Sequence, residues 1–497
     1  MMQPGVLRRR ELIPKVCARC LGRKPGTIPL LILIAATPMV AQDLPASPER
    51  PWHSSEERRI ANEATRLRRS LLRIEPDKIY SLAELIDLAE THNPETRVAW
   101  ENARARAAAL GIARSELYPV LSAVALASVY REQVPFGSRF FRQTVPGYEA
   151  SLELNYTLFD FGARRGRIAA EGARLLAANF VFNDVHRKVI YQVQQAYYRL
   201  LNASGQEIAA RASLANAQTV QQSAEERLRN GLATLPDVLE ARSVTAQAQY
   251  ELQAILGAEE IARGDLATSL GTSAATTIRV QPLSEIPTPD SIGDTVEKVM
   301  SRALEQRPDL QEDLADIRVA SAQRNEAQAA FYPSLDVKVY PRAQSLYLLQ
   351  QTLPWAHTAG LNGELGFNLN WTVFDGGARR SRLAQTEARI RGAEAQASAT
   401  RYRIEDEVWT AYSNLNTAFR QREAAAALLT AASQSYAAAL ESYNFGVRNL
   451  LDVTAAQRVL AQARSADVLA RVQVLSTLAD LAFRSADSIQ APRRPQP

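Results

Sequence analysis

An internal repeat constrains this chain more than any other feature. The stretch "NYTLFDFGARRGR" at 155–167 returns as "NWTVFDGGARRSR" at 370–382, with nine of thirteen positions identical at an offset of 215 residues. Three flanking landmarks recur in the same order at offsets of 214 or 215: "NPE" at 93–95 with "RPD" at 307–309, Tyr118-Pro119 with Tyr332-Pro333, and 231–241 with 446–456. An ordered set at one spacing indicates a tandem duplication. The fold must therefore contain two equivalent units, the second with one extra residue between its Tyr-Pro and Phe-Asp landmarks.

Each unit predicts a pair of β-strands. From Leu361 to Val373, apolar side chains alternate with small or polar ones, and the first copy repeats this pattern. A period of two is typical of a strand with one apolar face. Shorter alternations predict a partner strand in each copy. The predicted strands are 120–130, 150–158, 335–339 and 361–373, with loops containing proline and aromatic residues near 131–147 and 341–359.

The remaining long segments predict helices. They are rich in alanine, and glycine and proline gather at a few boundaries, as long helices require. Two proline-free segments, 165–229 and 379–443, would each span about 100 Å at 1.5 Å per residue. Two shorter helices per copy, placed end to end, would roughly match one long helix. Their predicted ranges are 95–117 and 236–270 in the first copy, and 309–330 and 451–484 in the second.

The strands indicate a membrane barrel shared between chains. Transmembrane strands alternate apolar and polar residues, and about 9–11 residues cross a bilayer. Four strands do not close a barrel alone, and an open sheet edge is not tolerated in lipid. Since about eight strands make a filled barrel, a pore needs at least three chains. We therefore predict a mixed α/β membrane protein whose homotrimer forms a 12-stranded β-barrel, four strands per chain. An ordinary soluble coiled coil does not explain the strands, and a soluble β-sandwich would need more of them.

The N-terminal segment predicts export. Basic residues precede a short apolar run from Ile28, followed by small residues near Ala41. A membrane helix needs about 20 apolar residues, so a cleaved secretory signal at 1–41 is favoured over an uncleaved anchor. Cys17 and Cys20 lie in this segment, which would leave the mature chain without a thiol. Beyond residue 41 the chain holds 51 basic and 52 acidic residues, so a nucleic-acid partner has no electrostatic support.

The duplicated "NPE/RPD", "YP", "FD-x-G-x-R" and "G-x5-DV" landmarks resemble the TolC-like outer membrane factor family over roughly residues 80–484. The resemblance implies a trimeric barrel in the outer membrane of a Gram-negative cell, continued by a periplasmic α-helical barrel. It also implies a passive exit duct of a tripartite efflux or type I secretion system. An adaptor protein and an inner membrane pump of the RND or ABC type would open this duct by docking.

The repeat and the resemblance together predict how the chain is divided. The expected parts are a signal peptide at 1–41, a charged segment at 42–80, a first repeat at 81–271, a linker at 272–294, a second repeat at 295–484 and a disordered tail at 485–497. By resemblance, the linker contributes to a belt around the helical tunnel.

Two kinds of turn carry the candidate functional residues. At each strand-to-helix turn, a phenylalanine ends a strand at the membrane interface and an aspartate can cap the following helix. These residues are Phe159, Asp160, Gly162, Phe374, Asp375 and Gly377. At the other end of the long helices, glycine-containing turns are placed by the resemblance at periplasmic tips where adaptors dock. The tip residues are Gly231, Leu232, Leu235, Gly446, Val447 and Leu450.

The resemblance also implies a gate at these tips. Asp452 would line the narrow entrance, and Arg448 would form the tip-to-tip bonds that hold it shut. A second aspartate of the family pattern is here Ala455, so the entrance would carry one charged ring. Asp237 is the first-copy counterpart of Asp452 and could be only a helix cap.

An enzyme is not supported by the sequence. The histidines His53, His92, His186 and His357 lie apart, without a second ligand at metal spacing. The sequence lacks Gly-x-Ser-x-Gly, His-Glu-x-x-His and nucleotide-loop motifs, so we expect no catalysis, cofactor or metal. The rival class is a periplasmic helical adaptor, or a structural coiled-coil protein without a pore, which would lack lipid-type strands.

Overall fold

A computed structural model describes residues 59–63, 74–75, 77–289, 291, 293–350 and 356–487. The chain divides into two compact units, residues 1–69 and 70–497. In the first unit the structure describes one short helical stretch at 59–63. The predicted signal, most of the charged segment, and the tail from residue 488 lie outside the described residues.

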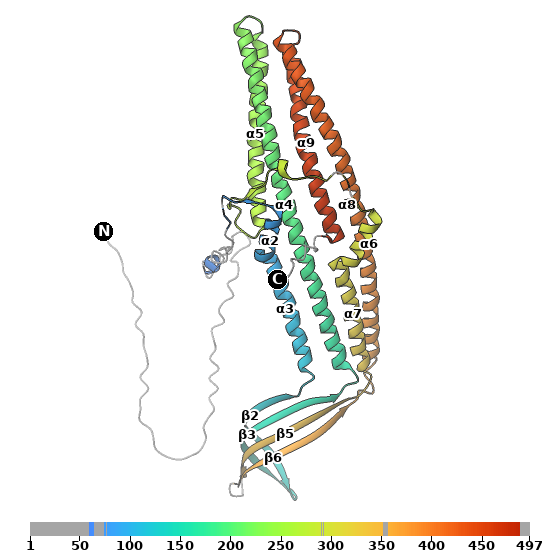
Figure 1. The fold of residues 1–497 in the computed structure, drawn as a ribbon. Coiled ribbons are helices and arrows are strands. Elements are labelled where there is room, and N and C mark those ends of the chain that lie inside the picture. The colour runs from blue at the N-terminus through green and yellow to red at the C-terminus, as the bar shows by residue number, and fades with distance from the viewer. Residues whose placement is uncertain are drawn as a thin grey trace, which may run out of the picture. The chain divides into compact units, whose positions relative to one another are not determined.

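Two long helices organise the second unit. α4 (Ala163–Arg229) and α8 (Ala378–Asn444) contain 67 residues each and run from the strands to the opposite tips (Figure 1). The shorter helices α3 (Pro94–Ser115) and α5 (Leu235–Ser269) lie along α4, and α7 (Pro308–Ala329) and α9 (Leu450–Ser485) lie along α8. The six predicted helix ranges are confirmed to within two residues at each end. No helix of the described residues is long and apolar enough to cross a membrane.

The helices pack in one row. Their contacts give the order α3 and α5, then α4, then α7 and α9, then α8. α4 therefore has a pair of helices on each side, whereas α8 is contacted by α7, α9 and the short helix α6 (Val296–Gln306) and has no second pair of helices in the described part of the chain. The side of α8 that faces away from α7 and α9 is therefore an uncovered surface, although the equivalent side of α4 is covered.

Two glycines bring α4 close to its second pair of neighbours. A Cβ atom at Gly166 would lie 2.8 Å from the main-chain nitrogen of Glu326 in α7, and a Cβ at Gly205 would lie 2.6 Å from Cγ1 of Val468 in α9. Any larger residue would force these helices apart. The equivalent positions of α8 are Ser381 and Arg420.

Several short elements were not predicted. α2 (Leu82–His92) and α6 (Val296–Gln306) precede α3 and α7. β1 (Ile79–Tyr80), at the end of the charged segment, pairs in parallel with β4 (Arg279–Val280) of the linker, which also contains the 3-10 helix η1 (Leu283–Glu285). The expected tail begins too early, because Ser485 ends α9 and Asp487 pairs with Arg302 of α6 at 2.9 Å.

Four strands form one antiparallel sheet in the order β2-β3-β5-β6. They are β2 (Val120–Phe136), β3 (Arg139–Phe159), β5 (Ser334–Gln350) and β6 (Ala356–Asn370). The four predicted strands are confirmed as this sheet, but the loops predicted at 131–147 and 341–359 are wrong because most of those residues are strand. Pro135 lies on the edge strand β2, and Pro146 and Pro341 lie in gaps of the β3–β5 pairing, where no ladder N–H is required.

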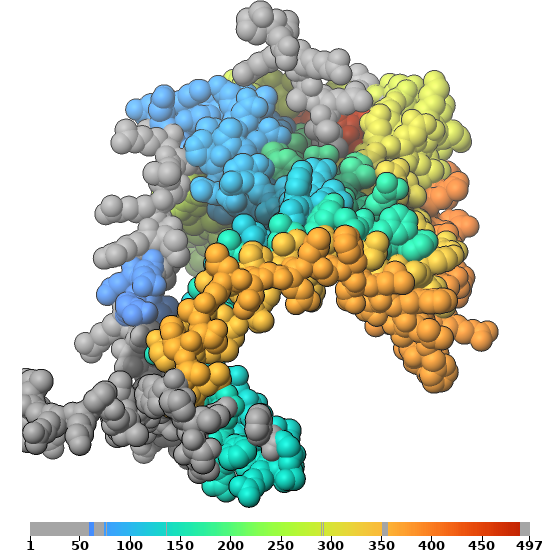
Figure 2. Space-filling view, turned by 90° about the horizontal axis from the view of Figure 1, so that it is seen from below, coloured from blue at the N-terminus to red at the C-terminus, as the bar shows by residue number. Residues whose placement is uncertain are grey.

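The register gives the sheet one apolar and one polar face. Pairing places apolar side chains together on one side: Leu121, Ala123 and Ala125 of β2, Ala150, Leu152 and Leu154 of β3, Leu335, Val337 and Val339 of β5, and Leu365, Phe367 and Leu369 of β6. On the opposite side, Thr157 donates a hydrogen bond to Asp336 at 2.7 Å, and Tyr340 donates one to Glu149. Seen from below, the strands form a curved wall beside a hollow (Figure 2).

Candidate functional site

In the first copy, an aspartate and an arginine close the strand-to-helix turn. Asp160 accepts hydrogen bonds from the main-chain N–H groups of Gly162 (3.2 Å) and Arg164 (2.8 Å) at the start of α4. The Arg164 guanidinium contacts the same carboxylate at 3.0 Å and donates to the main-chain oxygens of Glu116, just past α3, and Leu158 in β3. One side chain therefore joins the end of a helix, the end of a strand and the start of the next helix.

The second copy repeats this arrangement. Asp375 accepts from the N–H groups of Gly377 (3.1 Å) and Arg379 (3.0 Å), and the Arg379 guanidinium contacts the carboxylate at 2.8 Å. Gly162 and Gly377 have φ of +99° and +89°, a conformation that favours glycine.

The two phenylalanines differ in position. Phe159 is the last residue of β3, as predicted, and its ring packs edge-on against Phe161 at 4.6 Å. Phe374 was also expected to end a strand, but β6 stops at Asn370. The reason is that β5 begins at Ser334, so residues beyond Asn370 have no partner strand within the chain.

These contacts shift the pKa values of both aspartates. Burial raises the pKa of Asp160, but the N–H groups and the guanidinium of Arg164 together hold it below its usual value. The pKa of Asp375 is also lowered, first by the hydrogen bond from the Arg379 main chain. Both side chains are therefore stabilised as carboxylates in the folded protein.

We expect Asp160→Ala to destabilise the protein by about 1–2 kcal/mol, because the start of α4 loses its cap and Arg164 loses its counter-ion. Since the folded-state pKa is depressed, this contribution is present above the ordinary aspartate pKa of about 3.9 and disappears as pH falls below it. Thermal unfolding of the purified protein in detergent measures both effects. Asp87→Ala, which changes an exposed aspartate of α2, is the control. Equal melting temperatures for the two variants at neutral pH would contradict the prediction.

At the opposite end of the long helices, two turns form the tips (Figure 1). Gly231 and Gly446 take φ of +73° and +75°, and both helix pairs contribute to one apolar cluster that includes Val238. Leu232, Leu235 and Val447 are exposed, which leaves them accessible to a partner. Leu450 is 2% exposed and packs in this cluster. Its predicted docking role is therefore corrected to a packing role.

The two tip aspartates are used differently. Asp237 accepts hydrogen bonds from the hydroxyl (2.7 Å) and main-chain N–H (2.9 Å) of Thr234, and these bonds lower its pKa. In the second copy, Asn449 caps the helix by accepting from the Asp452 N–H at 2.9 Å. The side chains of Asp452 and Arg448 make no hydrogen bond or ion pair with the described part of the chain. Asp237 therefore caps α5, while the Asp452 carboxylate is available to the surroundings.

A tip residue that the sequence did not single out is Arg227. From the last turn of α4, it donates to the main-chain oxygens of Tyr443 (2.8 Å) and Asn444 (3.1 Å) at the end of α8. Its guanidinium also lies 4.7 Å from the centre of the Tyr443 ring. Arg227 thus ties the first-copy tip to the second-copy tip. The sequence does show a basic residue four positions before the Gly231 turn, which is typical of a residue that binds the last carbonyl groups of its own helix. Arg227 instead binds carbonyl groups of another helix, and the sequence alone does not indicate this.

Among the described residues, no group of three histidine, cysteine, aspartate or glutamate side chains could hold a metal ion.

Comparison with known proteins identifies the family. The family model described as "Outer membrane efflux protein" matches residues 85–272 and 299–484. The chain belongs to the outer membrane efflux protein family. It is 29% identical to Protein CyaE of Bordetella pertussis over 398 residues, covering 79% of this chain and 81% of that protein. It is 26% identical to outer membrane protein OprJ of Pseudomonas aeruginosa over 386 residues, covering 76% and 78%.

Solved structures share the fold. A membrane protein from Pseudomonas aeruginosa superposes with a TM-score of 0.72 at 25% identity, covering 81% of this chain and 93% of that one. The outer-membrane channel OprN gives a TM-score of 0.72 at 21% identity, covering 83% and 93%. The expected family, fold class and location are confirmed. As an outer membrane efflux protein, the chain is a channel that lies in the outer membrane and extends into the periplasm, and its family comprises channels rather than enzymes.

Proposed function

We propose that this outer membrane efflux protein works as a homotrimer, the passive exit duct of a tripartite efflux or type I secretion system. A periplasmic adaptor and an inner membrane pump of the RND or ABC type open it by docking at the tips. The observation that carries the trimer is the sheet, which has an apolar face and two open edges, β2 and β6. An open edge is not tolerated in lipid, and three copies supply 12 strands, enough for a pore.

The internal repeat supports a specific register between copies. Within the chain, Thr157 of β3 is paired with Asp336 of β5. Moving each residue by the repeat offset pairs Thr372 of one copy with Ser122 on β2 of the next. This pairing gives the residues beyond Asn370 the partner strand that they lack in a single chain.

Disulfide formation tests this register. In a chain carrying Ser122→Cys and Thr372→Cys, mild oxidation in outer membranes is expected to give a covalent trimer, because directly paired strand residues lie within disulfide reach. Ser122→Cys with Asn368→Cys is the matched control, since four residues move the second cysteine about 14 Å along the strand. Monomer alone, or equal cross-linking of the control, would count against the proposal.

A further inference from the structure

The two repeats differ where the shorter helices meet, midway along the long ones. In the second copy this junction is filled by ion pairs. Arg307, 3% exposed, contacts Asp309 and Glu407 at 2.6 Å each, and Arg484 contacts Glu407 at 3.1 Å. Buried charges are stable only when paired in this way.

Side chains of α4 cover the second-copy junction. Arg187 donates to the main-chain oxygen of Phe483 at 2.6 Å, with its guanidinium 4.3 Å from the ring centre. Tyr191 stacks on the same ring at 4.3 Å and donates to Asp480 at 2.8 Å. The junction is therefore both filled from within and closed by the neighbouring helix.

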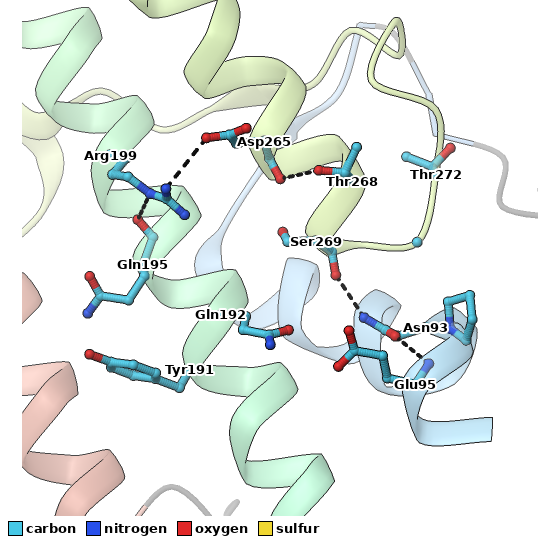
Figure 3. A pocket seen from close by; sticks show the side chains of 12 residues that line it. Asn93, Glu95, Tyr191, Gln192, Gln195, Arg199, Asp265, Thr268, Ser269 and Thr272 are labelled. Atoms are coloured by element: carbon cyan, nitrogen blue, oxygen red, sulfur yellow. Dashed lines mark hydrogen bonds and ion pairs between the residues drawn. The ribbon is translucent and has the colours of Figure 1, made fainter. Parts of the chain in front are cut away.

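The first-copy junction is hollow. A cavity of about 620 Å³ lies between the start of α3, the middle of α4 and the end of α5 (Figure 3). Small or neutral residues replace three of the four charged ones: Asn93 stands for Arg307, Gln192 for Glu407, and Ser269 for Arg484, while Glu95 stands for Asp309. Asn93 donates to the main-chain oxygen of Ser269 at 3.0 Å, and Arg199 pairs with Asp265 at 3.5 Å. These polar groups already have partners, whereas the carboxylate of Glu95, which also lines the cavity, makes no hydrogen bond or ion pair with the described part of the chain.

The helix equivalent to α4 carries an exposed side chain that suits the cavity. α8 presents Tyr402, 69% exposed, at the position where α4 has Arg187, 2% exposed. Farther along the same face, Trp409 is also exposed. Ser413 and Asn416 are exposed where α4 has the buried residues Tyr198 and Leu201. The uncovered face of α8 is thus the face that α4 buries against α7 and α9.

We propose that Tyr402 of one copy enters this cavity in the next copy and lies against Glu95 and Thr268. The inference rests on the proposed trimer. At the repeat offset, Tyr402 is equivalent to Arg187 and Thr268 is equivalent to Phe483. Because Arg187 donates to the main-chain oxygen of Phe483, the Tyr402 hydroxyl is positioned to donate to the main-chain oxygen of Thr268. A buried tyrosine ring needs such a partner for its hydroxyl.

Photo-cross-linking tests the contact in the full chain. With p-benzoylphenylalanine at position 402, irradiation of outer membranes is expected to give covalent dimers and trimers, with the link mapped by mass spectrometry to peptides containing Glu95 or Thr268. The same amino acid at Phe445, an exposed tip residue, is the control and is expected to leave those peptides unlinked. Links from position 402 only to other segments, or to other proteins, would overturn the inference.

Two further measurements separate this inference from the trimer. Tyr402→Ala is expected to lower the fraction of trimer that survives dilution in detergent about tenfold, and Tyr402→Phe less, since it retains the ring. If Ser122→Cys and Thr372→Cys cross-link while position 402 does not reach the cavity, the trimer stands and the Tyr402 contact is wrong. If neither cross-link forms, the proposed trimer itself fails.

Discussion

Replacing Arg227 with alanine is expected to raise the resting conductance of the channel in planar bilayers. The change removes two hydrogen bonds that hold the end of α8 to the end of α4. A charged donor at a partly exposed site contributes about 2 kcal/mol through such bonds. If these bonds are lost when the tips separate, the open-to-closed ratio rises roughly 30-fold.

Arg229→Ala is the matched control for Arg227→Ala. Arg229 lies two residues farther along and is exposed, and its nearest carboxylate, that of Glu226, is 4.0 Å away. Its loss is expected to leave the conductance unchanged, and Arg227→Lys is expected to fall between alanine and the native protein. If Arg227→Ala conducts like Arg229→Ala, the two tips are not held together by this side chain.

Asp452→Asn is expected to weaken cation selectivity and block by divalent cations. In the proposed trimer, three Asp452 carboxylates surround one axis, and acidic rings favour cations. A carboxylate about 5 Å from a passing ion in water changes the local concentration of a monovalent cation roughly fourfold. Reversal potentials in a salt gradient, and conductance titrated with a divalent cation, measure the two effects.

Asp237→Asn tests whether a tip aspartate acts as a charge at the entrance or as a helix cap. Asp237 already accepts two hydrogen bonds from Thr234, so its replacement is expected to lower thermal stability and to leave selectivity unchanged. Unchanged selectivity and block in Asp452→Asn would show that Asp452 does not line the entrance.

Arg448 has no partner within the described part of its own chain, and we expect its bonds to run to another copy.

The helices were predictable because their signals are local. Pro94 and Pro308 begin helices, the long segments lack proline, and glycine ends both tips, so the ends agree to within two residues. Strand length was not predictable, because proline has no N–H group and fits in a strand only where no hydrogen bond to the neighbouring strand is needed from that position. That condition depends on which strand lies beside Pro146 and Pro341.

The same contrast holds for the candidate site. The aspartate of each "FD-x-G-x-R" turn bonds residues two and four positions away, so its contacts follow from spacing. The bond from Arg227 to Tyr443 spans 216 residues, and no local pattern encodes it. Leu450 illustrates the reverse error. The resemblance placed it among the tip residues where adaptors dock, but packing between the two tips buries it.

Joining two repeats in one polypeptide changes what a single mutation can do. In a ring of six identical hairpins, every substitution would occur six times. In this chain, Gly166 and Gly205 bring α4 close to its neighbours, while the matching α8 positions are Ser381 and Arg420. In the proposed trimer, we therefore expect the contacts of α4 within each chain to be closer than the contacts of α8 with the next copy. A substitution on α8 in that trimer would alter the three contacts between copies and leave the three contacts of α4 within the chains unchanged.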